Sequence, residues 1–93
     1  MVAVRIDGPD DGAVSATAER LAQLALALAK GGSVEVRGPV PAPLARLRGR
    51  SRWQIWLRAP DRTALRRVAR GVATAEIAAG VRVSVDVDPV AAL

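Results

Sequence analysis

The order of two kinds of hydrophobic repeat restricts the fold of this chain more than any other feature of its sequence. Four segments alternate apolar and polar residues and are predicted to be strands with one buried face: 2–7, 33–38, 52–58 and 81–88. Two segments repeat apolar residues every three or four positions and are predicted to be amphipathic helices: 11 to about 30, and 62 to about 79. The predicted order of elements is therefore βαββαβ.

This order predicts an α+β, ferredoxin-like sandwich. Two right-handed βαβ crossovers place both helices on one face of a four-stranded antiparallel sheet and leave the other face open. A chain of 93 residues has room for one hydrophobic core, so we expect a single domain over residues 1–93.

Two segments of the chain need separate treatment. Pro39, Pro41 and Pro43 alternate within residues 38–50, and proline cannot pair in a central strand, so this segment is predicted to be a stiff extended loop that reaches away from the sheet. In the strand that follows, Trp53, Ile55 and Leu57 should face the core. Trp56 should lie on the polar face.

Composition excludes several classes of chemistry. The chain has no Cys and no His, which excludes disulfides, the usual structural zinc sites and Ser–His or Cys–His catalysis. It also has no phosphate-binding GxxxxGK[ST] segment. We therefore expect a chain that is not an enzyme and holds no metal or cofactor. The longest uncharged apolar run, residues 21–29, is too short for a bilayer, and acidic residues precede it, so a cytoplasmic protein is expected.

Charge is distributed unevenly along the chain, whose formal net charge is +5. Residues 37–70 hold ten Arg against one acidic residue, Asp61, which gives a net charge of +9. The other residues hold four basic and eight acidic residues, which gives −4. An arginine-rich composition alone would spread the positive charge, whereas a binding surface collects it. The distribution therefore indicates a polyanionic partner.

Arginine occupies every second position from 46 to 52. In an extended chain this spacing would direct Arg46, Arg48, Arg50 and Arg52 to one side at intervals of about 6.6 Å, close to the separation of phosphates in an extended nucleic-acid strand. We interpret them as phosphate contacts. The alternative is a solvated hairpin whose arginines only keep it soluble.

Three further features could carry function. Trp56 lies between Arg52 and Arg58 on the polar side of its strand and could stack on a base, or could instead pack under the proline-rich segment or against another domain. A helical stripe that could bind phosphate or an acidic peptide, or form an ordinary solvated face, contains Arg62, Arg66 and Arg70, with Arg67 beside it. Asp86 and Asp88 share one side of the last strand, where pairing with Arg82 or with the arginines of residues 38–50 explains them better than metal binding or acid–base chemistry.

Three motifs together suggest a known family: GPVPAP at 38–43, LRGRSRWQ at 47–54 and DVDP at 86–89. In this order and spacing, they resemble the C-terminal domain of primosomal protein N′, the PriA family of replication-restart proteins. The resemblance is close over residues 34–89 and looser over the rest of the chain. Members of that family are ATP-dependent 3′→5′ DNA helicases that recognise stalled forks, and their ATPase motifs and zinc-binding cysteines lie upstream of this domain.

The resemblance implies an accessory domain that binds fork or single-stranded DNA and helps bind the acidic tail of single-stranded-DNA-binding protein. The spacing and charge of the residues, and not the resemblance, indicate the DNA contacts: Arg46, Arg48, Arg50, Arg52, Trp56 and Arg58. The family commonly has a smaller aliphatic residue where this chain has Trp56. Arg62 matches a family arginine that holds the tail, and Arg66 replaces a family glutamine. The helicase lobes of a full-length protein would be further partners. Two alternatives remain: an RNA-binding or ribosomal-type module, and a purely structural docking domain.

Overall fold

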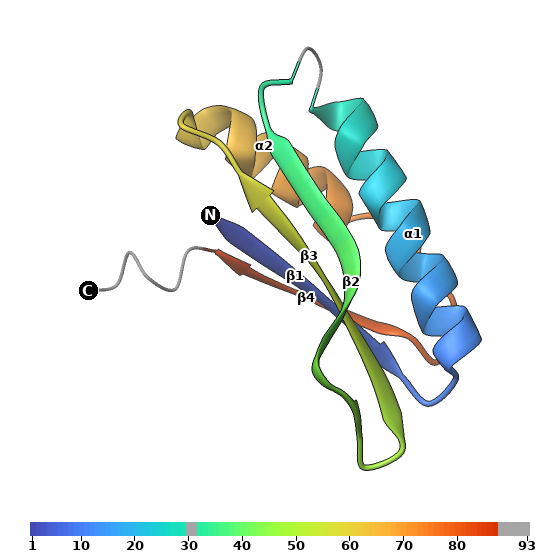
Figure 1. Ribbon diagram of the computed structural model, residues 1–93. Coiled ribbons are helices and arrows are strands. Elements are labelled where there is room, and N and C mark those ends of the chain that lie inside the picture. The colour runs from blue at the N-terminus through green and yellow to red at the C-terminus, as the bar shows by residue number, and fades with distance from the viewer. Residues whose placement is uncertain (30–31, 88–93) are drawn as a thin grey trace.

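The computed structural model describes residues 1–29 and 32–87, which form one layer of helices and one sheet (Figure 1). In chain order the elements are β1 (Val2–Gly8), α1 (Asp11–Leu28), β2 (Glu35–Leu47), β3 (Arg50–Arg58), α2 (Arg62–Ala73) and β4 (Arg82–Val87). The strand order across the sheet is β2-β3-β1-β4, and every neighbouring pair is antiparallel. The predicted ferredoxin-like βαββαβ arrangement is confirmed.

Both helices cover the same face of the sheet (Figure 1). The core lies between them and the two central strands, because the apolar sides of all these elements meet there. Its fully or almost fully buried members include Val14, Ala18 and Leu21 of α1, Val68 and Val72 of α2, Val4 and Ile6 of β1, and Ile55 and Leu57 of β3. The opposite face of the sheet, called the open face below, carries the polar residues of the same strands.

Each helix begins at an aspartate whose side chain accepts a backbone hydrogen bond. Asp10 Oδ1 accepts from the Gly12 amide at 3.1 Å, and Asp61 Oδ1 accepts from the Thr63 amide at 2.9 Å. Such caps satisfy amides that have no partner within the helix and stabilise it by about 1 kcal/mol. The predicted start of the second helix at residue 62 is therefore confirmed.

The second helix is shorter than the sequence pattern suggested. It ends at Ala73 rather than near Ala79, because the Ala75 amide donates to the Val72 carbonyl at 3.3 Å instead of to the Gly71 carbonyl, which accepts from the Thr74 hydroxyl at 3.4 Å. Ala75 and Ile77 still pack against the core. Because these two residues are apolar, the sequence pattern of a helix continues past Ala73, although the helix itself does not.

The proline-rich segment also differs from its prediction. The loop expected over residues 38–50 is instead part of β2, which continues to Leu47 and pairs with β3 through irregular register. Prolines are tolerated there because β2 is an edge strand, so one side of its backbone needs no partner. Gly38, at φ +102°, lies at the first irregularity. The hairpin of β2 and β3 does extend beyond the other strands (Figure 1).

Neither helix of the described ranges combines the length and the hydrophobicity that crossing a membrane requires.

Candidate nucleic-acid interface

The alternation of β3 divides its residues between two environments. Ser51, Ile55 and Leu57 are buried on the helix side, which Trp53 shares, whereas Arg52, Gln54 and Trp56 lie on the open face. Antiparallel pairing then brings polar residues of β1 and β4 beside them, because directly opposed residues share a face. The arginines of this face are Arg5, Arg37, Arg50, Arg52, Arg58 and Arg82, and its carboxylates are Asp7, Glu35 and Asp86.

The four arginines from 46 to 52 do not form the straight row that their spacing suggested. The chain reverses at Arg48 and Gly49, whose φ angles of +54° and +75° are those of a tight two-residue hairpin turn. Arg46 therefore pairs with Ser51 and lies on the helix side, where its Nη2 donates to the Pro9 carbonyl at 3.4 Å. The expectation that all four point one way is wrong, because it assumed an unbroken extended chain.

Arg50 and Arg52 do share the open face, but only one of them is held by a carboxylate. Arg50 Nε donates to Asp7 Oδ2 at 3.0 Å. Arg52 lies directly across from Asp7 in the sheet, yet its guanidinium group forms no hydrogen bond or ion pair within the described chain. Arg48 is exposed at the tip of the hairpin. Of the predicted row, Arg48 and Arg52 are thus the two with guanidinium groups unengaged among described residues.

Asp7 is the most strongly engaged carboxylate of the open face. Arg82 donates to both of its oxygens, from Nε at 3.2 Å and from Nη2 at 2.9 Å. Partial burial by itself raises the pKa of Asp7, but hydrogen bonds and charges from Arg82 and Arg50 outweigh it and hold the pKa below its ordinary value. The hydrogen bond to Asp7 in turn raises the pKa of Arg82.

The remaining ion pairs of this face are exposed. Arg5 Nη1 lies 3.1 Å from Asp86 Oδ2, and Arg37 pairs with Glu35, whose pKa falls because of the hydrogen bond from that arginine. Asp86 is therefore paired with an arginine, but its partner is Arg5 and not Arg82 or an arginine of residues 38–50, as the sequence suggested. Asp88 lies outside the described residues. Arg58 has no hydrogen bond or ion pair in the described ranges. Exposed ion pairs of this kind contribute little to stability, and their arginines can bind another anion in place of the carboxylate.

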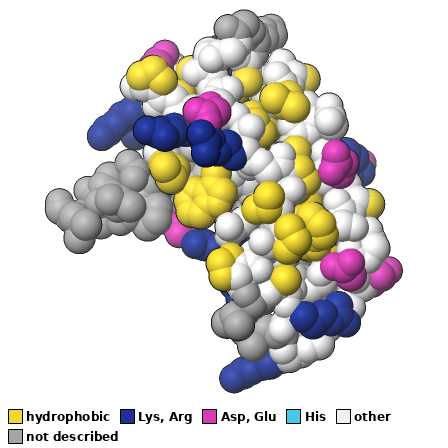
Figure 2. Space-filling model, in the orientation of Figure 1, with side chains coloured by type: hydrophobic (Ala, Val, Ile, Leu, Met, Phe, Trp, Pro, Cys, Tyr) yellow, Lys and Arg dark blue, Asp and Glu magenta, His cyan; other side chains and the backbone are white. Residues whose placement is uncertain are grey.

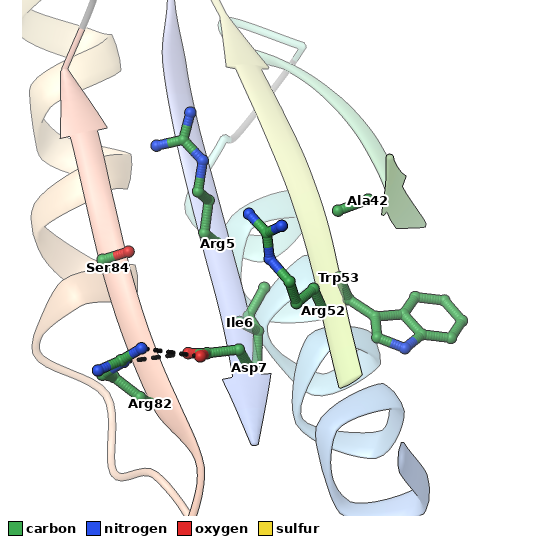
Figure 3. Close-up of a pocket in the computed structure, with 8 residues that line it drawn as sticks. All are labelled: Arg5, Ile6, Asp7, Ala42, Arg52, Trp53, Arg82 and Ser84. Carbon is green, nitrogen blue, oxygen red and sulfur yellow. Dashed lines mark hydrogen bonds and ion pairs between the residues drawn. The ribbon is translucent and has the colours of Figure 1, made fainter. Parts of the chain in front are cut away.

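A recess of about 390 Å³ opens over the centre of this face, with Arg5, Asp7, Arg52, Arg82 and Ser84 among its lining residues (Figure 3). The side chains of Arg5 and Arg52 project from β1 and β3 on the same side of the sheet, and Trp53 points away from them (Figure 3). The Trp53 indole is partly buried against the core, as predicted, and its Nε1 donates to Asp11 Oδ1 at 3.2 Å.

Trp56 lies on the open face, as the alternation predicted, and is half-buried. It lines a second recess, of about 300 Å³, together with Met1, Arg37 and Arg58. Ala3, its direct neighbour across β1, has an exposed fraction of 0% although it belongs to the open face, because larger side chains around it cover it. One part of the indole therefore covers Ala3 of β1, and another part is accessible between Arg37 and Arg58.

The arginines of α2 flank a different recess. Arg62 and Arg66 line a cavity of about 290 Å³ whose apolar residues include Leu65, Ala69 and Val87. Neither guanidinium has a hydrogen bond or ion pair in the part of the chain that the structure describes. An apolar cavity beside two free cations suits a peptide that carries both carboxylates and a hydrophobic side chain.

Basic side chains gather in two places on the face of the molecule seen in Figure 2. Arg side chains lie at the hairpin end of the sheet and again near the opposite end of β2 and β3, with hydrophobic side chains between them. Within the described residues, His, Cys, Asp and Glu form no group of three that could hold a metal ion.

Comparison with known families matches residues 1–90 to the primosomal protein N C-terminal domain. The chain belongs to this family. Over 58 residues, 60% of the chain, it is 38% identical to a protein of Haemophilus influenzae named replication restart protein PriA. The match covers 8% of that relative, so the chain spans a small part of the length of this much larger protein.

Three arginines of this primosomal protein N C-terminal domain were missed as candidates from the sequence: Arg5, Arg37 and Arg82. Arg5 and Arg82 lie far from residues 37–70 in the sequence and reach the open face only through strand pairing, whereas Arg37 stands at the start of that segment, on β2. The alternation of residues 2–7 and 81–88 already placed Arg5 and Arg82 on polar strand faces. Combined with the expected ferredoxin-like strand order, it would have placed them beside Arg52.

Proposed function

We propose that this domain is an accessory DNA-binding module of a replication restart protein. Its open face would contact backbone phosphates of fork or single-stranded DNA. The observation that carries the proposal is the excess of six arginines over three carboxylates on that face, where Arg52 and Arg58 lack a partner among described residues. Membership of the primosomal family supports the same class of partner.

The predicted residues would make different kinds of contact with DNA. Arg52 and Arg58 would bind phosphates directly, and Trp56 between them would stack on a base. Arg48 would contact the backbone from the hairpin tip. Arg46 and Arg50, already engaged with Pro9 and Asp7, would contribute positive potential. In the full-length protein, an ATP-dependent 3′→5′ helicase, catalysis would belong to other parts of the chain.

A salt titration tests the proposed DNA contacts. For the three direct phosphate contacts of Arg48, Arg52 and Arg58 on duplex DNA, log affinity should fall against log salt with a slope of about −2.7. Replacing Arg52 and Arg58 together by Gln should reduce the magnitude of the slope by about 1.8. Arg67→Gln with Arg70→Gln is the matched control, since it removes the same charge from α2 on the other side of the sheet. Salt-independent binding, or an equal loss in the control, would contradict the proposal.

RNA and protein are the other partners to distinguish. The open face offers a single aromatic side chain, Trp56, where RNA-recognition sheets stack two or three bases, so DNA oligomers should compete at least as well as RNA oligomers of equal length. If the helicase lobes instead cover the arginines, deleting the domain from the full-length protein should impair ATPase activity as much as fork binding.

We also propose that Arg62 and Arg66 help bind the acidic tail of single-stranded-DNA-binding protein, with the apolar residues of the α2 recess receiving a hydrophobic side chain of the tail. Charge-assisted hydrogen bonds contribute about 1.5–3 kcal/mol, so Arg62→Ala and Arg66→Ala should each weaken a labelled tail peptide about tenfold or more. Arg67→Ala, one position outside the recess, is the control. Unchanged affinity in Arg62→Ala would reject this contact.

A further inference from the structure

Asp7 separates two arginines that the sheet presents to it symmetrically. Its Cα partner in β3 is Arg52, and its Cα partner in β4 is Arg82. Of these two neighbours only Arg82 binds the carboxylate, and Arg50 supplies the second partner from the hairpin. Asp7 therefore binds Arg50 and Arg82 and does not bind the third arginine, Arg52.

Arg50 and Arg82, whose side chains are 39% and 73% exposed, are held through the half-buried Asp7 and not by their own burial. Arg82 meets both carboxylate oxygens, which is the strong, two-point form of a charged hydrogen bond. The Asp7 side chain is only 19% exposed, so its charge depends on these donors more than a solvated carboxylate would. A phosphate that recruited Arg50 or Arg82 would leave Asp7 with a partly unpaired charge. These two arginines are poorly available to nucleic acid for that reason.

The two arginines on the other side of the recess are available. Arg52 has no hydrogen bond or ion pair among described residues, and Arg5 is paired with Asp86 at 3.1 Å with side chains 45% and 42% exposed. Such a solvated pair is easily replaced by a stronger anion. Arg5 and Arg52 project to the same side of the sheet beside Ser84, whose hydroxyl is a further donor (Figure 3). Two planar guanidinium groups beside a recess match the oxygens of one phosphate.

We infer that the recess on the open face binds one phosphodiester of the nucleic-acid strand between Arg5 and Arg52, and that Asp7 withholds Arg50 and Arg82 from that strand. This inference rests on the proposed DNA-binding function and makes it more specific. The positive face would thus make one defined phosphate contact, and Asp7 would limit the number of arginines that are available to the nucleic acid. Arg5 and Asp7 are positions that the arginine-rich segment alone does not include.

The test compares arginines on the two sides of Asp7. With a twelve-residue oligothymidylate as the probe, each single-strand phosphate contact contributes about 0.7 to the magnitude of the salt slope. Arg52→Gln and Arg5→Gln should each remove about 0.7, whereas Arg82→Gln, which removes the same charge from the same face, should leave the slope nearly unchanged. Asp7→Asn should release two arginines and increase the slope by up to about 1.4. Arg52→Lys, which keeps the charge, should restore most of the slope.

Far-UV circular dichroism and thermal unfolding of each variant establish that the sheet is intact. Equal slope changes in Arg52→Gln and Arg82→Gln, in folded proteins that still bind DNA, would overturn this inference and leave the proposed function standing. No salt-dependent DNA binding by the unaltered chain would overturn both. A titration with inorganic phosphate forms a separate arm: phosphate binding that depends on Arg52, with oligonucleotide binding that does not, would assign the recess to free phosphate and overturn the inference.

Discussion

The indole of Trp53 in β3 donates a hydrogen bond to Asp11 in the first turn of α1, with Nε1 and Oδ1 3.2 Å apart. The same carboxylate oxygen accepts from the buried Ser51 hydroxyl, two residues earlier in β3. Ser51 is opposite Arg46 of β2, so one carboxylate links the base of the hairpin to the start of the helix. The hairpin that carries Arg48 is thereby fixed to the body of the domain.

Asp11→Ala should loosen this link and destabilise the domain, because the buried Ser51 hydroxyl then loses its acceptor. We expect a lower urea midpoint and a red shift of Trp53 emission, measured in a Trp56→Phe background so that one indole reports. Glu19→Ala is the control, since Glu19 is an exposed acid of the same helix whose carboxylate forms no hydrogen bond among the described residues. Equal effects in the two variants would show that helix charge, and not the link, is responsible.

Acid should weaken the fold through Asp7 and Asp11. Hydrogen bonds from Ser51 and then Trp53 lower the pKa of Asp11, and those from Arg82 and Arg50 outweigh burial at Asp7 to lower its pKa. A carboxyl with a lower pKa in the folded state contributes stability that is complete above its unfolded pKa, about 3.9, and disappears as the pH falls through the folded value. Unfolding free energy should therefore decrease progressively below about pH 5.

The Asp7 part of this acid dependence can be isolated. Asp7→Asn removes one titrating group, so the curve of unfolding free energy against pH should become shallower below about pH 4. Urea titrations from pH 6 to 2 in both proteins measure the difference. Identical acid dependence in the variant and the original chain would mean that Asp7 does not contribute in the way its arginine contacts require.

Gly38 is required by its close approach to β3. Its φ is +102°, and a Cβ there would lie 2.9 Å from the Gln54 carbonyl oxygen and 3.1 Å from the Val40 nitrogen. Gly38→Ala should therefore destabilise the domain by more than the roughly 1–2 kcal/mol that a left-handed conformation alone costs. Gly49→Ala, at φ +75° with open space around the new Cβ, should show the conformational cost alone. Comparable losses at both sites would contradict the steric account.

Local patterns were sufficient to predict the order of the elements. Alternation identified all four strands, and the apolar repeat at every third or fourth position identified both helices, since these signals depend on neighbouring residues alone. The path of β2 was not predictable in this way. Proline is excluded from a central strand but tolerated at an edge, and the position of β2 at the edge of the sheet follows from pairing with residues far along the chain.

The arrangement of the candidate site was predicted less well for the same reason. An Arg-Gly pair is a weak turn signal beside Asn-Gly, so the reversal at Arg48 and Gly49 was not recognised and the arginines were treated as one row. The ion pair of Asp7 with Arg82 joins residues 75 positions apart and cannot be read from any local window. Which arginines remain unpaired is decided by such contacts.

Trp56 offers a direct optical test of whether nucleic acid reaches the open face. It is half-buried and shares its recess with Arg37 and Arg58, so a base stacked on the accessible part of the ring would be held between two cations. Stacking on an aromatic side chain contributes about 1–3 kcal/mol per base, so Trp56→Leu should weaken oligothymidylate binding by about five- to 150-fold. In a Trp53→Phe background, where the partly buried Trp53 no longer emits, oligothymidylate should quench the remaining emission to saturation. Binding that leaves both emission and affinity unchanged would mean that Trp56 serves only to cover β1, as the complete burial of Ala3 beside it already allows.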